Sequence, residues 1–245
     1  MTYTFEVAVD SLDSALIARA CGAQRIELCA DLPSGGLTPS PGLLELACQR
    51  LDIPVAALIR PRRGDFLYSD AEIAVMRRDI DFARRAGASA VVIGCLTADG
   101  SVDCQRMGQL IEQALPLPAV FHRAFDMCRD PFATLERLAG LGISRLLTSG
   151  QAQSAAAGAP LIAQLVQQAA GRLTIMPGGG INAGNIRPIA RTTGAREFHF
   201  SARRQADSRM IYRNPRLSLG NSDDYARWEA SAERIRAILS ALRGA

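Results

Sequence analysis

The sequence predicts a single-domain (β/α)₈ barrel, on the basis of its strand spacing, its length and its first turn. Short apolar runs alternate with longer amphipathic segments along the whole chain, a pattern typical of β–α units. Eight such units fill 245 residues with little left over, and this barrel needs about 250. A doubly wound open sheet is the alternative, but the first strand leads into VDSLDS rather than the glycine-rich turn of that fold. We therefore expect one domain over residues 1–245.

Eight strands are expected at intervals of roughly 20 to 35 residues. They are residues 5–9, 25–28, 55–59, 90–93, 119–122, 145–148, 174–177 and 197–200. Helical patterns lie between them, most clearly over 11–23, 70–88 and 130–142, where a polar residue precedes the apolar periodicity and glycine follows it. Residues 201–222 form a long connection after the last strand, as expected of a lid or of a contact between subunits. Its arginines, Arg203, Arg204, Arg209 and Arg213, could close over an anion.

The composition excludes several classes of chemistry and of partner. All 28 basic residues are arginine, so a Schiff-base lysine, a lysine general base and a P-loop lysine are excluded. The net charge of +4 is scattered and no basic run carries aromatic residues, which argues against nucleic acid as a partner. No apolar run approaches the roughly 18 residues of a membrane span, and the N-terminus lacks a signal-peptide pattern. We expect a cytoplasmic protein with no membrane partner.

Charged side chains are expected inside the barrel, because successive strand residues point to opposite faces. In EFHFS, residues 197–201, the phenylalanines are expected to face the helices, so that Glu197, His199 and Ser201 point inward. The same rule sends inward Glu6, Arg25, Glu27, Cys29 and Arg60. Buried ions need partners, so the lumen must hold a paired network that either fills the barrel or forms an active site. Barrel active sites lie at the C-terminal ends of the strands, which favours Glu27, Cys29, Arg60, His122, Arg123 and Ser201 over Glu6 and Glu197.

An acid–base site is one prediction for this rim. Glu27 and His122 could move protons, while Arg60 and Arg123 could hold a carboxylate or phosphate through their planar guanidinium groups. Without lysine or a nucleophile elbow, the compatible reactions are proton abstraction, isomerisation and lyase-type cleavage. An ordinary hydrogen-bonded histidine at a strand end is the alternative.

A phosphate-binding loop is predicted after the seventh strand. MPGGGIN places Gly178, Gly179 and Gly180 immediately beyond the strand, and a helix is expected to begin near Asn182. Backbone N–H groups in such a loop, together with a helix N-terminus, bind phosphate, and barrels often build this site after strands seven and eight. The alternative is a tight turn that requires positive φ.

A metal site is a third possibility for the rim. Cys29, Cys95 and Cys128 all follow predicted strand ends, with Met127 and Met176 near them in sequence. Thiolate and thioether ligands suit Cu(I). The other candidate ligand set consists of His122, His199 and Glu27. No two cysteines form a C-x-x-C pair, so the sequence leaves both sets open.

Several longer motifs resemble the copper homeostasis protein CutC family. They are RIELCADLPSGGLTPS, IRPRRGDFLYSDAE, VFHRAFDMCRDP, LLTSGQ and MIYRNPRLSLG. The resemblance runs from the first strand nearly to residue 220. It implies a cytoplasmic (β/α)₈ barrel with a role in copper tolerance and trafficking, a Cu(I) ligand at Cys29 in ELCAD, and self-association as a dimer or tetramer.

The resemblance also implies a polar rim. Its members are Glu27, Arg60, Arg62, Asp65, His122, Arg123, Asp126 and Ser149, to which the residues themselves add Gly178, Gly179, Gly180, His199 and Ser201. We expect Glu27, Arg60, His122, Arg123 and Asp126 to be catalytic and the others to bind ligand. Three functions stay open at this point: a copper homeostasis protein that binds copper, an enzyme acting on a small anionic or phosphorylated metabolite, and a non-catalytic barrel with a structural or partner-binding role.

Overall fold

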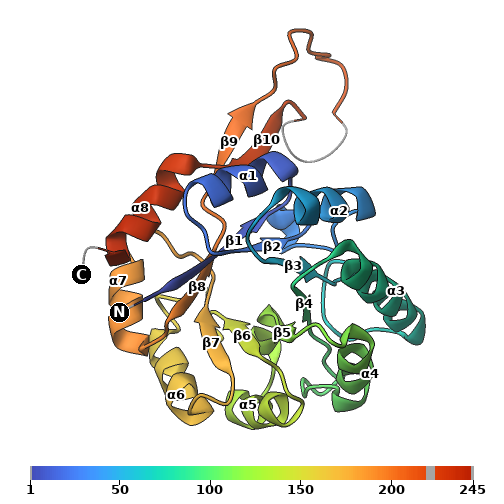
Figure 1. Ribbon diagram of the computed structural model, residues 1–245, viewed down its shortest axis with the longest axis vertical. Coiled ribbons are helices and arrows are strands. Elements are labelled where there is room, and N and C mark those ends of the chain that lie inside the picture. Colours follow the sequence, from blue (N-terminus) through green and yellow to red (C-terminus); the bar gives the residue numbers. More distant parts are fainter. Residues whose placement is uncertain (1, 219–223, 244–245) are drawn as a thin grey trace.

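The computed structural model describes residues 2–218 and 224–243 and contains one (β/α)₈ barrel (Figure 1). Its parallel strands are β1 (Thr4–Val9), β2 (Arg25–Leu28), β3 (Val55–Leu58), β4 (Ala90–Ile93), β5 (Ala119–Phe121), β6 (Arg145–Thr148), β7 (Thr174–Pro177) and β8 (Glu197–Phe200). They are hydrogen-bonded in the order β7-β6-β5-β4-β3-β2-β1-β8. A parallel bridge between Gly178 and His199 joins the two ends of this sheet. Every predicted strand agrees with an observed one to within one residue at each end.

In the described part of the chain, eight helices cover the outside of the barrel. They are α1 (Leu12–Ala20), α2 (Pro41–Arg50), α3 (Asp70–Ala86), α4 (Cys104–Ala114), α5 (Pro131–Gly140), α6 (Ala159–Ala169), α7 (Ile186–Thr193) and α8 (Ala232–Arg243), with short 3₁₀ turns at Leu32–Ser34 and Arg123–Met127. Local sequence fixes the start of α3 most completely. The Ser69 side chain accepts from the Glu72 N–H while the Glu72 carboxylate accepts from the Ser69 N–H, and this reciprocal pair satisfies two N–H groups that the helix leaves open.

The apolar core has an outer and an inner part. The outer part lies between strands and helices and includes Phe198 and Phe200, as the alternation in EFHFS predicts. The inner part occupies one side of the lumen and is made of small or branched residues: Cys29, Ala56, Leu58, Ala90, Val92 and Val120. The strands β3 to β5 are thus buried on both faces, as is usual for parallel strands. Charged lumen residues are left mainly to β1, β2 and β8, on the opposite side, and Arg145 at the start of β6 joins them.

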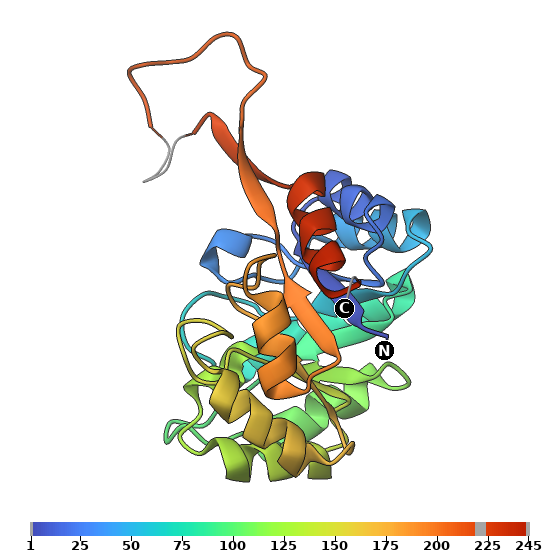
Figure 2. The same cartoon turned by 90° about the vertical axis from the view of Figure 1, so that its left-hand side faces the viewer.

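Residues 201–222 contain a strand rather than only a loop. β9 (Arg203–Asp207) pairs antiparallel with β10 (Ala226–Ala230), and this hairpin projects away from the barrel (Figure 2). The Ala230 N–H donates to Ser14 Oγ at 3.1 Å, which anchors the base of the hairpin to α1. Residues 219–222, and the end of the motif MIYRNPRLSLG, lie outside the described part of the chain.

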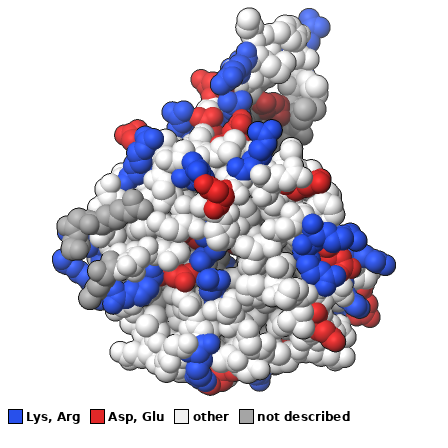
Figure 3. Space-filling model, viewed as in Figure 1, with Lys and Arg blue, Asp and Glu red and all other residues white. Residues whose placement is uncertain are grey.

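Acidic and basic side chains are interspersed on the face seen in Figure 3 rather than gathered into a basic stripe. Many arginines pair with neighbouring carboxylates, such as Arg19 with Asp52 and Arg172 with Glu136. Within residues 2–218 and 224–243, no helix combines the length and the apolar character that crossing a bilayer demands.

Candidate functional site

A cavity of about 310 Å³ opens where the strands of the barrel end. Its size is at the lower end of the range for small-molecule sites. Predicted site residues that line it are Glu27, Arg60, His122, Arg123, Gly179, Gly180, His199 and Ser201. The remaining wall is mostly apolar, with Leu32, Leu58, Phe66, Leu147, Ile181 and Phe200, and includes Arg203 from the start of β9. The fold therefore brings most of the predicted rim to one mouth.

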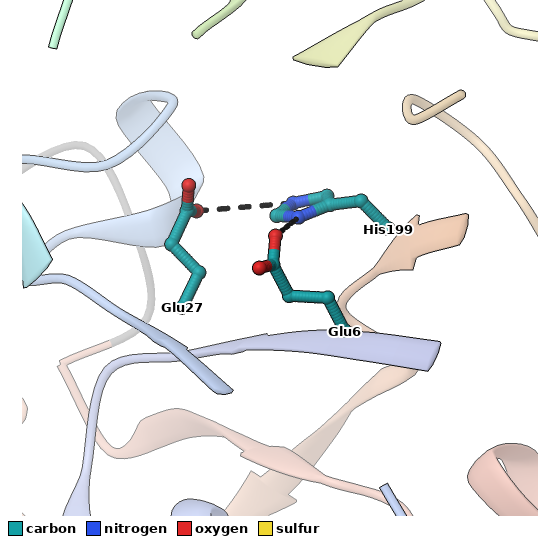
Figure 4. Close-up of side chains that lie close together, drawn as sticks. All are labelled: Glu6, Glu27 and His199. Atoms are coloured by element: carbon teal, nitrogen blue, oxygen red, sulfur yellow. Dashed lines mark hydrogen bonds and ion pairs between the residues drawn. The ribbon is translucent and has the colours of Figure 1, made fainter. Parts of the chain in front are cut away.

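His199 lies between two buried carboxylates, Glu6 and Glu27 (Figure 4). Its Nδ1 is 2.7 Å from Glu6 Oε1, and its Nε2 is 3.8 Å from Glu27 Oε2. Adjacent strands bring the three together, because Glu6 is opposite His199 in the β1–β8 register and β2 borders β1. This is the one group of three in the described residues whose histidine, cysteine or carboxylate ligand atoms all lie within 4.8 Å.

The two carboxylates differ sharply in pKa. Burial raises the pKa of Glu27 to about 7, which the positive charge of His199 only partly opposes. Burial acts on Glu6 in the same direction, but its hydrogen bond and attraction to His199, together with Arg25, bring the Glu6 pKa down to about 2. Burial lowers the pKa of His199, but Glu27 and Glu6 outweigh it and raise that pKa. One carboxylate is thus a permanent anion, and the other titrates near neutrality as a general acid or base does.

An ionic network below this group closes the floor of the barrel. Arg25 Nε donates to Glu6, and Arg25 Nη2 donates to Glu197 Oε2 at 2.6 Å. Arg145 Nε donates to the same Glu197 oxygen at 2.9 Å. Each charge in this layer has a partner, which is the condition for burying ions at tolerable cost.

His122 is fixed as a neutral imidazole at the end of β5. Its Nδ1 accepts from the Ala124 N–H at 3.1 Å, so the proton of the neutral ring is on Nε2. Burial and the nearby Arg60 lower the His122 pKa to about 3. The side chain is 5% exposed, and Nε2 has no hydrogen-bond partner among the described residues.

Arg60 holds together the loops that follow β2 and β3. Its Nη1 donates to the carbonyls of Ser34 (3.1 Å) and Gly36 (2.9 Å), and its Nη2 donates to the Gly64 carbonyl (3.0 Å). No carboxylate of the described residues lies within ion-pairing distance of this buried guanidinium, and its Nε is buried without a partner. The Phe66 ring stacks 5.1 Å from it.

Arg123 is oriented by two other residues of the predicted rim. Asp126 Oδ2 accepts from Arg123 Nε at 2.7 Å, and Ser149 Oγ accepts from Arg123 Nη2 at 2.9 Å. Asp126 also accepts from the N–H groups of Ser149 and Gln151. Because this carboxylate is occupied and does not line the cavity, Asp126 and Ser149 are placed to position Arg123 rather than to touch a ligand.

The glycine loop after β7 contributes Gly179 and Gly180 to the cavity wall, both with positive φ. A Cβ at Gly179 would lie 3.2 Å from Ser149 Cβ, so the backbone approaches the rim closely. Gly178 lies behind it, against Leu147 and His199. The following helix begins at Ile186, not near Asn182, because the Asn182 N–H donates to the Asn185 side chain and a capped turn comes first.

Like Asp126, Ser149 and Gly178, three further predicted residues do not line the cavity: Arg62, Asp65 and Cys29. Arg62 pairs with Asp65 at 3.0 Å and with Glu72 at 2.5 Å, and so orders the loop between β3 and α3. Cys29 is fully buried, and its Sγ donates to the Val9 carbonyl at 3.4 Å. Burial raises the pKa of this thiol well above its ordinary value. Cys29 belongs to the inner core and Cys95 and Cys128 to the outer core, so the three thiols do not converge.

Two residues of the site receive too little weight from the sequence. Alternation sends Glu6 inward but favours the strand ends over it, although Glu6 is what fixes the His199 ring. The sequence predicts Arg203 only as one arginine of a lid, whereas it lines the cavity. Its position three residues after Phe200, the last residue of β8, is the signal that could have identified it.

Comparisons with known proteins identify the family. The model of the CutC family matches residues 3–204. A CutC family protein of Chromobacterium violaceum is 50% identical over 244 residues, covering 99% of each chain. The human protein named copper homeostasis protein cutC homolog is 51% identical over 220 residues, covering 90% of this chain and 81% of its own.

Solved structures agree with this result. A CutC structure from Streptococcus agalactiae has a TM-score of 0.79 and 34% identity, covering 82% of this chain and 99% of that one. An aldolase named QR15, at 15% identity, has a TM-score of 0.63 and covers 80% of this chain and 89% of its own, a likeness of fold alone. By sequence, by fold and by the motifs that form its rim, this chain belongs to the CutC family.

Proposed function

We propose that the cavity binds a small anionic molecule and that Glu27, assisted by His199, moves a proton to or from it. The observation that carries this proposal is a surplus of donors. Arg60 Nε, His122 Nε2 and Arg203 Nη1 are all buried, all belong to residues that line the cavity, and none has an acceptor among the described residues.

Buried donors without acceptors are costly, and the cost is larger for a charged group. Arg60 and Arg203 have no carboxylate within ion-pairing distance in the described chain, unlike the paired arginines of the barrel floor. A ligand with carboxylate or phosphate oxygens would supply both the acceptors and the missing negative charge. At Gly179 the cavity wall carries no side chain beside Arg123, since a Cβ there would lie 3.5 Å from the Arg123 Cζ.

The opposite wall supports proton transfer. With its pKa raised to about 7, Glu27 is present in both protonation states near neutrality, which suits a general acid or base. The Glu6 anion keeps His199 oriented towards Glu27. Because the chain has no lysine, the reaction classes are proton abstraction, isomerisation and lyase-type cleavage without a Schiff base.

The test is thermal stabilisation by inorganic phosphate, small dicarboxylates and phosphorylated sugars. We expect at least one class to raise the melting temperature of the native chain, and Arg203→Met and Arg60→Met to lose this response. Arg19→Met, which removes an exposed arginine on α1, is the control and should keep it. If no anion stabilises the native chain, or if both cavity variants respond like the control, the proposal is wrong.

Copper binding is a second candidate function. It is supported by the name of the mouse and human relatives, copper homeostasis protein cutC homolog, and by the close group of Glu6, Glu27 and His199. Carboxylate and imidazole ligands suit a divalent ion better than Cu(I), which would have to use Cys29. Titration with Cu(I) under reducing conditions, and separately with Cu(II), distinguishes the two: Cys29→Ser should abolish the first and His199→Asn the second. If the native chain, Cys29→Ser and His199→Asn bind copper equally, neither proposed copper site is correct.

We also propose that the protein is cytoplasmic and assembles as a dimer or tetramer. Exposed apolar side chains on the projecting hairpin, Met210, Ile211, Tyr212 and Leu217, favour contact with another protein surface. Light scattering during size-exclusion chromatography tests the assembly, and a monomer at micromolar concentration would contradict it.

A further inference from the structure

His122 has a geometry that suits hydrogen-bond donation rather than proton transfer. The hydrogen bond from the Ala124 N–H to Nδ1 fixes the neutral tautomer with its proton on Nε2. The ring packs against the backbone of Gly94, in the space that a side chain there would occupy, because a Cβ at position 94 would lie only 2.5 Å from His122 Cε1 and 2.6 Å from Nδ1. The Phe66 ring packs at 4.9 Å between centroids and closes another side.

The electrostatic surroundings keep this ring neutral. Burial, and the positive charge of Arg60, both oppose protonation of His122. No carboxylate of the described residues is within ion-pairing distance of it, whereas His199 has two. The two histidines of the chain therefore differ in charge. His199 lies near carboxylates that favour its charged form, whereas His122 is held as an uncharged donor.

We propose that His122 is a catalytic residue that donates a hydrogen bond from Nε2 to a carbonyl oxygen of the substrate, and that the substrate is an anionic carbonyl compound with a hydrogen on the adjacent carbon. This inference rests on the proposed function and names its substrate class. The role of His122 is suggested by the lack of lysine, because the chain cannot form a lysine iminium that would take up the electron pair of the broken C–H bond. The negative charge then develops on the carbonyl oxygen of the substrate, and buried neutral donors stabilise such an oxyanion.

The reaction step is a proton abstraction. The Glu27 carboxylate takes the proton from the carbon next to the carbonyl, the electron pair of that C–H bond forms a C=C bond, and the carbonyl π pair moves to oxygen. The resulting enolate accepts from His122 Nε2–H, which keeps its proton throughout. The anionic part of the substrate takes the place of the acceptors that Arg60 and Arg203 lack. Return of the proton from Glu27 to carbon completes an exchange or an isomerisation.

The first test reads the tautomer directly. Because the chain contains only two histidines, ¹⁵N spectra of histidine-labelled protein resolve both rings, and His199→Asn assigns them. We expect the His122 signals of a neutral ring protonated at Nε2, unchanged from pH 8 down to pH 5. A His122 that gains a proton in this range, or that carries its proton on Nδ1, would overturn the proposal while leaving the anion pocket intact.

The second test uses oxalate, a planar dianion that mimics an enolate beside a carboxylate. We expect His122→Leu to weaken oxalate binding by about 10- to 100-fold in calorimetry, as loss of a hydrogen bond to a charged group does. His122→Gln, which retains an N–H donor, should restore most of the affinity, and the Nε2–H proton of the native chain should move downfield on binding. Tight oxalate binding that His122→Leu does not weaken refutes the role of His122. If the native chain binds neither oxalate nor inorganic phosphate, the anion pocket itself is refuted.

Discussion

Replacing Glu27 by glutamine is expected to make the protein more stable, and increasingly so as the pH rises. Glu27 is 6% exposed, and burial raises its pKa from an ordinary 4.5 to about 7. A carboxyl whose pKa is raised by folding stabilises the folded chain fully below its unfolded pKa, and this contribution is lost as the pH rises through the folded value. The window is therefore from pH 4.5 to about pH 7, and glutamine has no such dependence.

The size of the effect follows from the two pKa values. The difference between 4.5 and about 7 corresponds to a loss of about 3 kcal/mol once the carboxylate is fully ionised in both states. The substitution also removes the attraction between Glu27 and His199, whose atoms are 3.8 Å apart, and this opposes the gain. We expect the Glu27→Gln chain to be more stable by about 1 to 3 kcal/mol at pH 8 and by little at pH 5.

The assay is urea denaturation of both chains at pH 5, 6, 7 and 8. Glu45→Gln, which changes a glutamate exposed on α2, is the matched control and should shift stability equally at every pH. A Glu27→Gln chain that is destabilised at pH 8, or whose difference from the native chain does not grow with pH, would refute the reasoning. It would mean that Glu27 is a satisfied anion like Glu6 and not the titrating group of the site.

Two further predictions concern the framework. Arg25→Leu removes the cation that Glu6 and Glu197 share, leaving Glu197 with Arg145 alone and Glu6 with His199 alone, and should cost about 3–5 kcal/mol in urea denaturation, whereas Arg19→Leu, at an exposed pair, should change stability little. Gly158→Ala would place a Cβ 1.9 Å from the Ser149 carbonyl oxygen, and should cost more than about 4 kcal/mol or prevent folding. Gly108→Ala in α4, where a Cβ meets nothing within 4 Å, should instead stabilise by about 1 kcal/mol. Near-equal effects of the two alanines would contradict the close packing at position 158.

The barrel could be predicted from sequence because its signals are local. Each strand is a short apolar run bounded by turns, and each helix has a cap and a periodic apolar face, so the eight units are visible before any long-range contact is considered. The β9–β10 hairpin could not be predicted, because it has no such local signal. β9 reads RRQAD and has no apolar alternation, and its pairing depends on backbone hydrogen bonds to a segment some twenty residues later, which no local pattern reveals.

The site could be predicted only in part. Alternation placed Glu27 and His199 inside the lumen, but the partner that orients His199 is Glu6, 193 residues away in sequence. The roles of Arg60 and Asp126 were also hidden, because Arg60 donates to backbone carbonyls and Asp126 accepts from backbone N–H groups as well as from side chains, and backbone partners leave no mark on residue identity. Sequence reasoning thus found which charges enter the barrel, and not which of them are already satisfied.

The distribution of unsatisfied groups distinguishes an active site from a plug of paired charges. If the lumen charges only filled the barrel, every donor should have an acceptor, at the mouth as at the floor. At the floor this holds, since Arg25 and Arg145 share Glu197. At the mouth it fails for donors of Arg60, His122 and Arg203, all in residues that line one cavity. The proposed ligand would supply the acceptors that these three donors lack, and Glu27 lines the cavity that would receive it.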